Sequence, residues 1–212
     1  MKYTLIALVA SLSLGSAAQA ANYILGASQI GGAPLANFEG KAEGLLIDTQ
    51  YAGVTFSQPD GGKPQIDNSP FLFGYQAASG TGVLTGSMSG GAPFPTVAGI
   101  IATFATPVSG VEAFMSDTAP LGNYNVTIFG AGNVVLETVN FTGASIQPGA
   151  YVGFTRGSAD IFAIQFGPSV AFGDAFAIDD LRTRGSGVPD GGNTLVLLAL
   201  GLISMLAIRR KA

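Results

Sequence analysis

The stretch YNVTIF-GAGN-VVLETVNF, from Tyr124 to Phe141, alternates apolar and polar residues on both sides of a short glycine-containing segment. Alternation with a period of two places successive side chains on opposite faces of an extended chain. A four-residue segment with glycine and asparagine between two such stretches is typical of a hairpin turn. The sequence therefore predicts antiparallel strands at Tyr124 to Phe129 and Val134 to Phe141, joined through Gly130 to Asn133.

The same alternation recurs along the chain, and no helical period is sustained between its two ends. Val97 to Phe104 and Val108 to Ser116 are expected to form a second pair around Thr106 and Pro107. Further strands are expected in the segments that begin at Tyr51, Phe71, Thr81, Tyr151, Asp160 and Ala175. About ten short strands at regular spacing favour an all-β fold, an antiparallel β-sandwich. The jelly-roll is the preferred topology, because its first and last strands can lie side by side.

The composition excludes several kinds of chemistry. The chain has no cysteine, histidine or tryptophan, which removes Ser-His-Asp triads, thiol nucleophiles and most zinc sites. Between Ala21 and Gly187, five Lys and Arg residues stand against twelve Asp and Glu residues, a net charge of −7. Because no basic stripe is present, nucleic acid is not an expected partner.

The N-terminus has the three parts of a secretory signal peptide in order. Lys2 precedes the apolar stretch Leu5 to Gly15, and the small residues Ala18 and Ala20 belong to the predicted cleavage site Ala18-Gln19-Ala20. We therefore expect residues 1–20 to be removed and residues 21–183 to form one exported β-sandwich ectodomain. That length suits a single domain with its own core.

The C-terminus combines a turn, an apolar stretch and a basic end. Residues 184–187 are expected to be a flexible linker, and the turn that follows consists of Val188, Pro189, Asp190, Gly191 and Gly192. The uncharged stretch Thr194 to Ile208 reaches roughly 22 Å as a helix, shorter than a hydrocarbon core of about 30 Å. We expect a short transmembrane helix whose basic end stays in the cytoplasm, namely Arg209, Arg210 and Lys211.

This arrangement resembles the PEP-CTERM class of bacterial C-terminal sorting signals in its VPDSG-type variant. The resemblance covers Val188 to Ala212. It implies a Gram-negative-type envelope, transient anchoring in the inner membrane, and cleavage by an exosortase near Val188 to Gly192. The product would then reside on the cell surface or in the exopolysaccharide-containing extracellular matrix. The alternative is an ordinary short tail anchor.

Acidic residues mark both ends of the predicted domain, in NFEG (Asn37 to Gly40) and FAIDDLR (Phe176 to Arg182). Alternation places Asp180 on the face of Phe176 and Ile178, at the edge of the core, where an unpaired carboxylate is costly. Glu39 and Asp180, together with backbone carbonyls, would supply the hard oxygen ligands that Ca²⁺ takes. Asp179 would be a further ligand or would face solvent.

The two acidic stretches resemble the ends of MAM-type domains. Those domains open with a Phe-Glu pair, close with an Asp-Asp pair and bind a cation there, although the MAM cysteines are absent from this chain. The resemblance implies a Ca²⁺ site at Glu39, Asp179 and Asp180. The alternative is that Glu39 or Asp180 caps a turn or pairs with Arg182 or Arg156.

Catalysis is not the expected role. Glu112 and Glu137 could serve a glycosidase only as a pair across a sugar, but nothing in the sequence pairs them, and single strand glutamates usually face water. The leading hypothesis is a non-catalytic cell-surface or extracellular-matrix protein, with an exosortase-like protease, exopolysaccharide and the inner membrane as partners. The alternative is a carbohydrate-binding module with Tyr75, Phe94 or Tyr124 as sugar platforms, and a secreted glycoside hydrolase is the third hypothesis.

Overall fold

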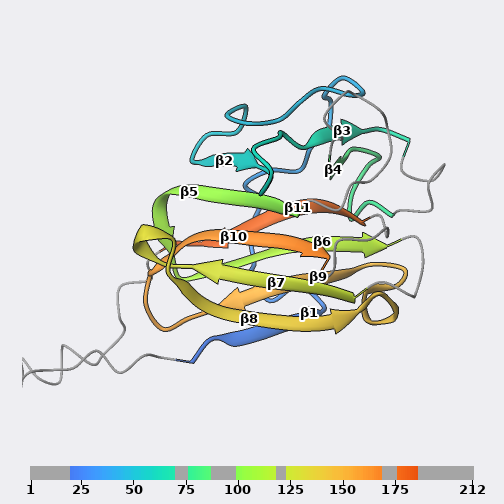
Figure 1. Ribbon diagram of the computed structural model, residues 1–212. Helices are drawn as coiled ribbons and strands as arrows, with labels where there is room; N and C mark the ends of the chain where they lie inside the picture. Colours follow the sequence, from blue (N-terminus) through green and yellow to red (C-terminus); the bar gives the residue numbers. More distant parts are fainter. Residues whose placement is uncertain (1–19, 70–75, 87–98, 118–122, 169–175, 186–212) are drawn as a thin grey trace, which may run out of the picture.

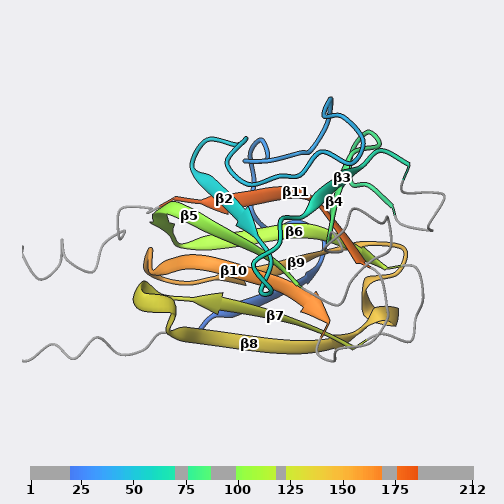
Figure 2. The same cartoon turned by 45° about the horizontal axis from the view of Figure 1, so that its top comes forward.

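Two antiparallel sheets packed face to face make up the described part of the protein (Figures 1 and 2). The computed structural model describes residues 20–69, 76–86, 99–117, 123–168 and 176–185. In spatial order the six-stranded sheet contains β1 (Asn22–Gly26), β9 (Ala150–Thr155), β6 (Gly110–Asp117), β11 (Phe176–Arg184), β4 (Val83–Thr85) and β3 (Gln65–Asp67). The five-stranded sheet contains β2 (Val54–Ser57), β5 (Ile100–Val108), β10 (Ile161–Pro168), β7 (Asn123–Phe129) and β8 (Val135–Thr142). The predicted antiparallel β-sandwich is confirmed.

The predicted hairpin is also confirmed, as the pair β7 and β8 at one edge of the five-stranded sheet. Its turn contains a short 3₁₀ segment, Ala131–Asn133. Gly132 and Asn133 have φ of 69° and 61°, and glycine and asparagine are the residues that tolerate this left-handed conformation. The turn chemistry read from the sequence therefore agrees with the backbone.

The second predicted pair is wrong, because β5 and β6 belong to different sheets. Thr106 and Pro107 lie inside β5, and Ser109 alone separates the two strands. The pairing of β5 with β10 shifts register between Thr103 and Val108, the stretch that contains Pro107, which has no N–H for a ladder hydrogen bond. Alternation shows which side chains face inward, but it does not show which strand is the neighbour.

From β4 onward the chain changes sheet at every connection except the β7–β8 hairpin. β4 therefore pairs with β11, the last strand. β1, the first strand of the described chain, pairs with β9 at the sheet edge, so the first and last described strands do not lie side by side.

One core fills the space between the sheets, and its largest fully buried side chains include Tyr124, Phe38, Phe56, Phe154 and Phe166. Tyr124 stacks on Phe141 with ring centroids 6.0 Å apart and meets Phe176 edge-on at 5.9 Å. Burial of these large apolar surfaces supplies the main stabilisation of the fold.

The outer faces of the two sheets differ. The segment that follows β1 folds over the six-stranded sheet, and Ile30 is buried there beside Gly110. Residues 76–82 are tied to the same sheet by the acidic side chains of β11. On the five-stranded sheet, by contrast, Thr55, Thr103 and Thr138 are exposed.

Gly153→Ala should destabilise the protein by about 1–3 kcal/mol, the usual cost of forcing extra volume into a packed site. A Cβ at Gly153 would lie 2.0 Å from the carbonyl oxygen of Val111, which belongs to the neighbouring strand and cannot give way easily. Gly31→Ala is the matched control, because no atom lies within 4 Å of its added Cβ. Urea unfolding of both variants measures the difference, and equal midpoints would contradict the close approach of β6 and β9.

Candidate functional site

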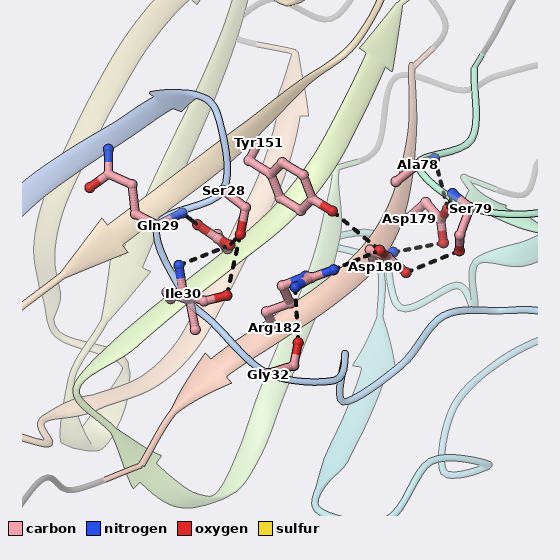
Figure 3. Close-up of polar contacts among 11 residues, drawn as sticks. Ser28, Gln29, Ile30, Gly32, Ala78, Ser79, Tyr151, Asp179, Asp180 and Arg182 are labelled. Atoms are coloured by element: carbon pink, nitrogen blue, oxygen red, sulfur yellow. Dashed lines mark hydrogen bonds and ion pairs between the residues drawn. The ribbon is translucent and has the colours of Figure 1, made fainter.

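Asp179 is fully buried and holds residues 76–82 against β11 (Figure 3). One of its oxygens accepts the backbone N–H groups of Ala78 and Ser79 at 2.9 and 3.1 Å. The other accepts the N–H of Asp180 at 2.7 Å. Burial raises the pKa of Asp179 from its ordinary value of 3.8 to about 7, although the three N–H donors oppose that rise. The sequence left open whether Asp179 faces solvent, and it does not.

A β-bulge explains why the acidic pair does not follow simple alternation. The pairing of β11 with β6 shifts register between Asp179 and Arg182, and Asp180 has a φ of 49°. Leu181, and not Asp180, joins Phe176 and Ile178 in the core. The prediction that Asp180 shares a face with Phe176 and Ile178 is therefore wrong. The extra residue of the bulge shifts the alternation by one position, so that the next side chain, and not that of Asp180, points into the core.

Asp180 is the centre of a polar cluster (Figure 3). Its carboxylate accepts hydrogen bonds from Ser79 Oγ at 3.2 Å, Tyr151 Oη at 3.2 Å and Arg182 at 3.0 Å. The Arg182 guanidinium lies 5.4 Å from the Tyr151 ring centroid and donates to the carbonyl of Gly32 at 2.9 Å. The predicted alternative of a pair with Arg182 is confirmed, whereas Arg156 pairs with Asp160 at 2.7 Å.

Glu39 reaches the far end of the same segment. Its carboxylate accepts the N–H groups of Thr81 and Gly82 at 3.2 and 2.9 Å. A Cβ at Gly82 would lie 2.6 Å from the carbonyl oxygen of Phe38, so only glycine permits this approach. The acidic residues from the two ends of the domain therefore meet on one segment, residues 76–82, as turn anchors.

These contacts occupy the carboxylates with N–H and O–H donors. In the described ranges no three acidic, histidine or cysteine side chains converge in a way that could hold a metal ion. Ca²⁺ binding by Glu39, Asp179 and Asp180 therefore stays a prediction from the MAM resemblance.

A thermal melt with and without excess EDTA tests that cation. A bound ion stabilises the folded state by mass action, so a resident Ca²⁺ predicts a lower midpoint in EDTA and its recovery on adding CaCl₂. An unchanged midpoint would remove the calcium prediction and leave hydrogen bonding as the role of the three carboxylates.

Glu112 is a buried anchor and not a surface residue. Its carboxylate accepts the N–H groups of Gln29 and Ile30 at 2.9 and 3.2 Å and a hydrogen bond from Ser28 Oγ. The expectation that it faces water is wrong, because the segment after β1 covers it. Glu137 lies on β8 in the other sheet, so the two glutamates do not form the pair that a glycosidase needs.

A hollow of about 260 Å³ on the five-stranded sheet was not predicted from the sequence. The residues that line it come from β2, β5, β7, β10 and the β7–β8 turn, namely Ser57, Ile101, Thr103, Phe129, Asn133 and Ala163. The prediction that Tyr124 is a sugar platform is wrong, because Tyr124 is fully buried in the core. Tyr75 and Phe94 lie outside the described residues.

The predicted export and sorting residues lie almost entirely outside the described ranges. This holds for Ala18, for Val188 to Gly192 and for Arg209 to Lys211, whereas Ala20 is described and exposed. β11 continues to Arg184, and Ser109 Oγ donates to the carbonyl of Gly185 at 2.8 Å, so the predicted linker begins inside the ectodomain. Among the described residues, no helix has the length and apolar character needed to cross a membrane.

Comparison with known proteins gives a coarse likeness in fold. No protein-family model and no curated protein matches the chain. The K2 cleaved adhesin domain of Lys-gingipain is similar with 16% identity and a TM-score of 0.47, over 70% of this chain and 95% of that chain. TmCBM61, solved in complex with β-1,4-galactotriose, is similar with 10% identity and a TM-score of 0.42, over 71% and 99%. At these values the likeness carries no inference about function.

The raised pKa of Asp179 predicts that stability falls as pH rises from about 4 to about 7. In that window the unfolded chain has lost the proton while the folded chain keeps it, so folding is favoured at the acidic end. Asp179→Asn keeps an oxygen acceptor but has no carboxyl group to titrate. It should therefore reduce the dependence of the unfolding free energy on pH by roughly 1 kcal/mol per pH unit.

Urea unfolding at pH 5, 6, 7 and 8 measures the slope for wild type and variant. Burial also raises the pKa of Asp67. Asp67→Asn is therefore the comparison variant, and it should remove only the part of the pH dependence of stability that Asp67 contributes. Parallel pH dependence of wild type and Asp179→Asn would contradict the prediction.

Proposed function

We propose that the protein is a non-catalytic, exported cell-surface or extracellular-matrix protein built on a jelly-roll β-sandwich. The observation that carries the non-catalytic role is the use of its acidic side chains. Glu39, Glu112, Asp179 and Asp180 each accept hydrogen bonds from covering loops. A general acid or nucleophile must instead face a substrate.

The jelly-roll assignment rests on the strand order. Strands β4 to β11 occupy the orders β9-β6-β11-β4 and β5-β10-β7-β8 within the two sheets. Eight strands that alternate between two sheets in this way correspond to the double Greek key of a jelly-roll. β1, β3 and β2 then extend the sheet edges.

Export and sorting rest on the two ends of the chain. The signal peptide of residues 1–20 would deliver the ectodomain across the inner membrane, and the short apolar stretch would hold it there. Because Pro189 and the two glycines that follow Asp190 resist helix formation, the VPDGG turn would stay extended and accessible to an exosortase-like protease. The cleaved product would join the surface or the exopolysaccharide matrix.

Replacing Arg209, Arg210 and Lys211 with Gln should reduce membrane retention and processing, because the basic cluster stops translocation. Lys63→Gln, an exposed lysine of the ectodomain, is the control for loss of positive charge elsewhere. Mass spectrometry of the surface-exposed wild-type protein should show a C-terminus near Val188 to Gly192. An intact Ala212 would contradict the processing and leave a plain membrane anchor.

A further inference from the structure

We propose that the outer face of the five-stranded sheet binds a neutral oligosaccharide, centred on the hollow between β2, β5, β10 and the β7–β8 turn. This inference deepens the proposed function and rests on it, since it names the ligand class of a non-catalytic matrix protein. Figure 1 shows β5, β10, β7 and β8 side by side in one layer.

The strand register aligns outward-facing side chains in two rows across the sheet. One row consists of Thr55, Thr103, Ala163 and Phe129. The next row consists of Ser57, Ile101, Gln165, Thr127 and Thr138. None of these residues is charged, although the predicted ectodomain has a net charge of −7. An uncharged face on an acidic domain favours a ligand that is itself uncharged, because an anionic polymer would be repelled by the surrounding field.

The hollow offers the two kinds of contact that a sugar ring needs. Ile101, Phe129 and Ala163 supply apolar lining, against which the C–H face of a sugar ring packs. Ser57, Thr103 and Asn133 add hydroxyl and amide groups to the same lining. Apolar contact with a few polar groups that fix orientation is the usual composition of a small-molecule site.

The polar groups that line the hollow are available to a ligand. Among the described residues, the side chains of Ser57, Thr103 and Asn133 make no hydrogen bond with one another or with any other group. These groups match the hydroxyls of a saccharide, which both donate and accept.

The hollow does not continue along the strands. A Cβ at Gly167 would lie 2.9 Å from the Cα of Gly99, so β10 and the start of β5 approach too closely there to leave space for a ligand. The proposed site is therefore confined to the hollow itself.

The competing cluster on the other sheet is a weaker candidate. Tyr151, Asp180, Arg182 and Ser79 bond to one another, so few of their polar groups are left for a ligand. Loops also cover that face, as Ile30 and Glu112 show by their burial.

The test uses the full chain on an array of neutral gluco-, galacto-, manno- and xylo-oligosaccharides beside uronate and sulfated glycans. The strongest neutral ligand is then titrated by calorimetry against three variants. Thr103→Lys should lower its affinity at least tenfold, because it puts a charge and a long side chain into the hollow. Asn133→Gly keeps the left-handed backbone but removes the amide, and it should lower affinity about 2- to 10-fold, as expected for one hydrogen bond.

Thr106→Lys is the matched control, because Thr106 is an exposed threonine of the same strand that does not line the hollow. It should bind as wild type does. Absence of binding to every neutral glycan, binding confined to charged glycans, or equal affinity of Thr103→Lys and wild type would each overturn this inference. Cleavage of a bound glycan would instead overturn the non-catalytic proposed function.

Discussion

The fold depends on a simple constraint: a carboxylate removed from water must receive hydrogen bonds from the protein. Glu112 and Asp179 are both fully buried on the six-stranded sheet, and both take backbone N–H groups from loops that cross it. The loops bury the two carboxylates, and the carboxylates accept hydrogen bonds from the backbone N–H groups of the loops. The burial of the carboxylates and the position of the loops therefore depend on each other. Segments 28–30 and 76–82, which have no strand pairing of their own in the described chain, are thereby fixed on the sheet.

This constraint divides the sandwich into two unlike faces. The outer face of the six-stranded sheet carries charged side chains, but these are paired within the protein, since Asp180 accepts hydrogen bonds from Arg182 and Tyr151. The outer face of the five-stranded sheet carries hydroxyl and amide groups around its hollow. Acidic residues are the usual signal of chemistry in a sequence, yet here they stabilise the scaffold, and the accessible face is the uncharged one.

The sequence predicts well what depends on neighbouring residues. The β7–β8 hairpin, the strand at Val54–Ser57 and the strand at Ala150–Thr155 follow from local alternation and turn chemistry. It does not predict the separation of β5 from β6, because inward-facing alternation is the same for a hairpin and for a crossing between sheets. The bulge at Asp180 is also hidden, since only the burial of Leu181 in the finished core favours the shifted register. The sequence marks Glu39 and Asp180, at the two ends of the domain, as a cation site or, alternatively, as residues that cap a turn or pair with Arg182. The hydrogen bonds agree with that alternative, but the sequence does not reveal that both residues contact the segment 76–82.

The hollow escaped prediction for a related reason. Its lining residues lie on four strands and a turn, from Ser57 to Ala163, and no two adjacent residues of the sequence contribute to it. Tyrosines and phenylalanines seen singly in the sequence suggest sugar platforms, but Tyr124, which lies on a strand with neighbours on both sides, belongs to the core instead. A row of Thr, Ser, Asn and Gln becomes a surface only when strand order and register bring its members together. Topology, and not any one residue, therefore creates the candidate binding face, and its lack of charge follows from the placement of Glu112, Asp179 and Asp180 on the opposite sheet.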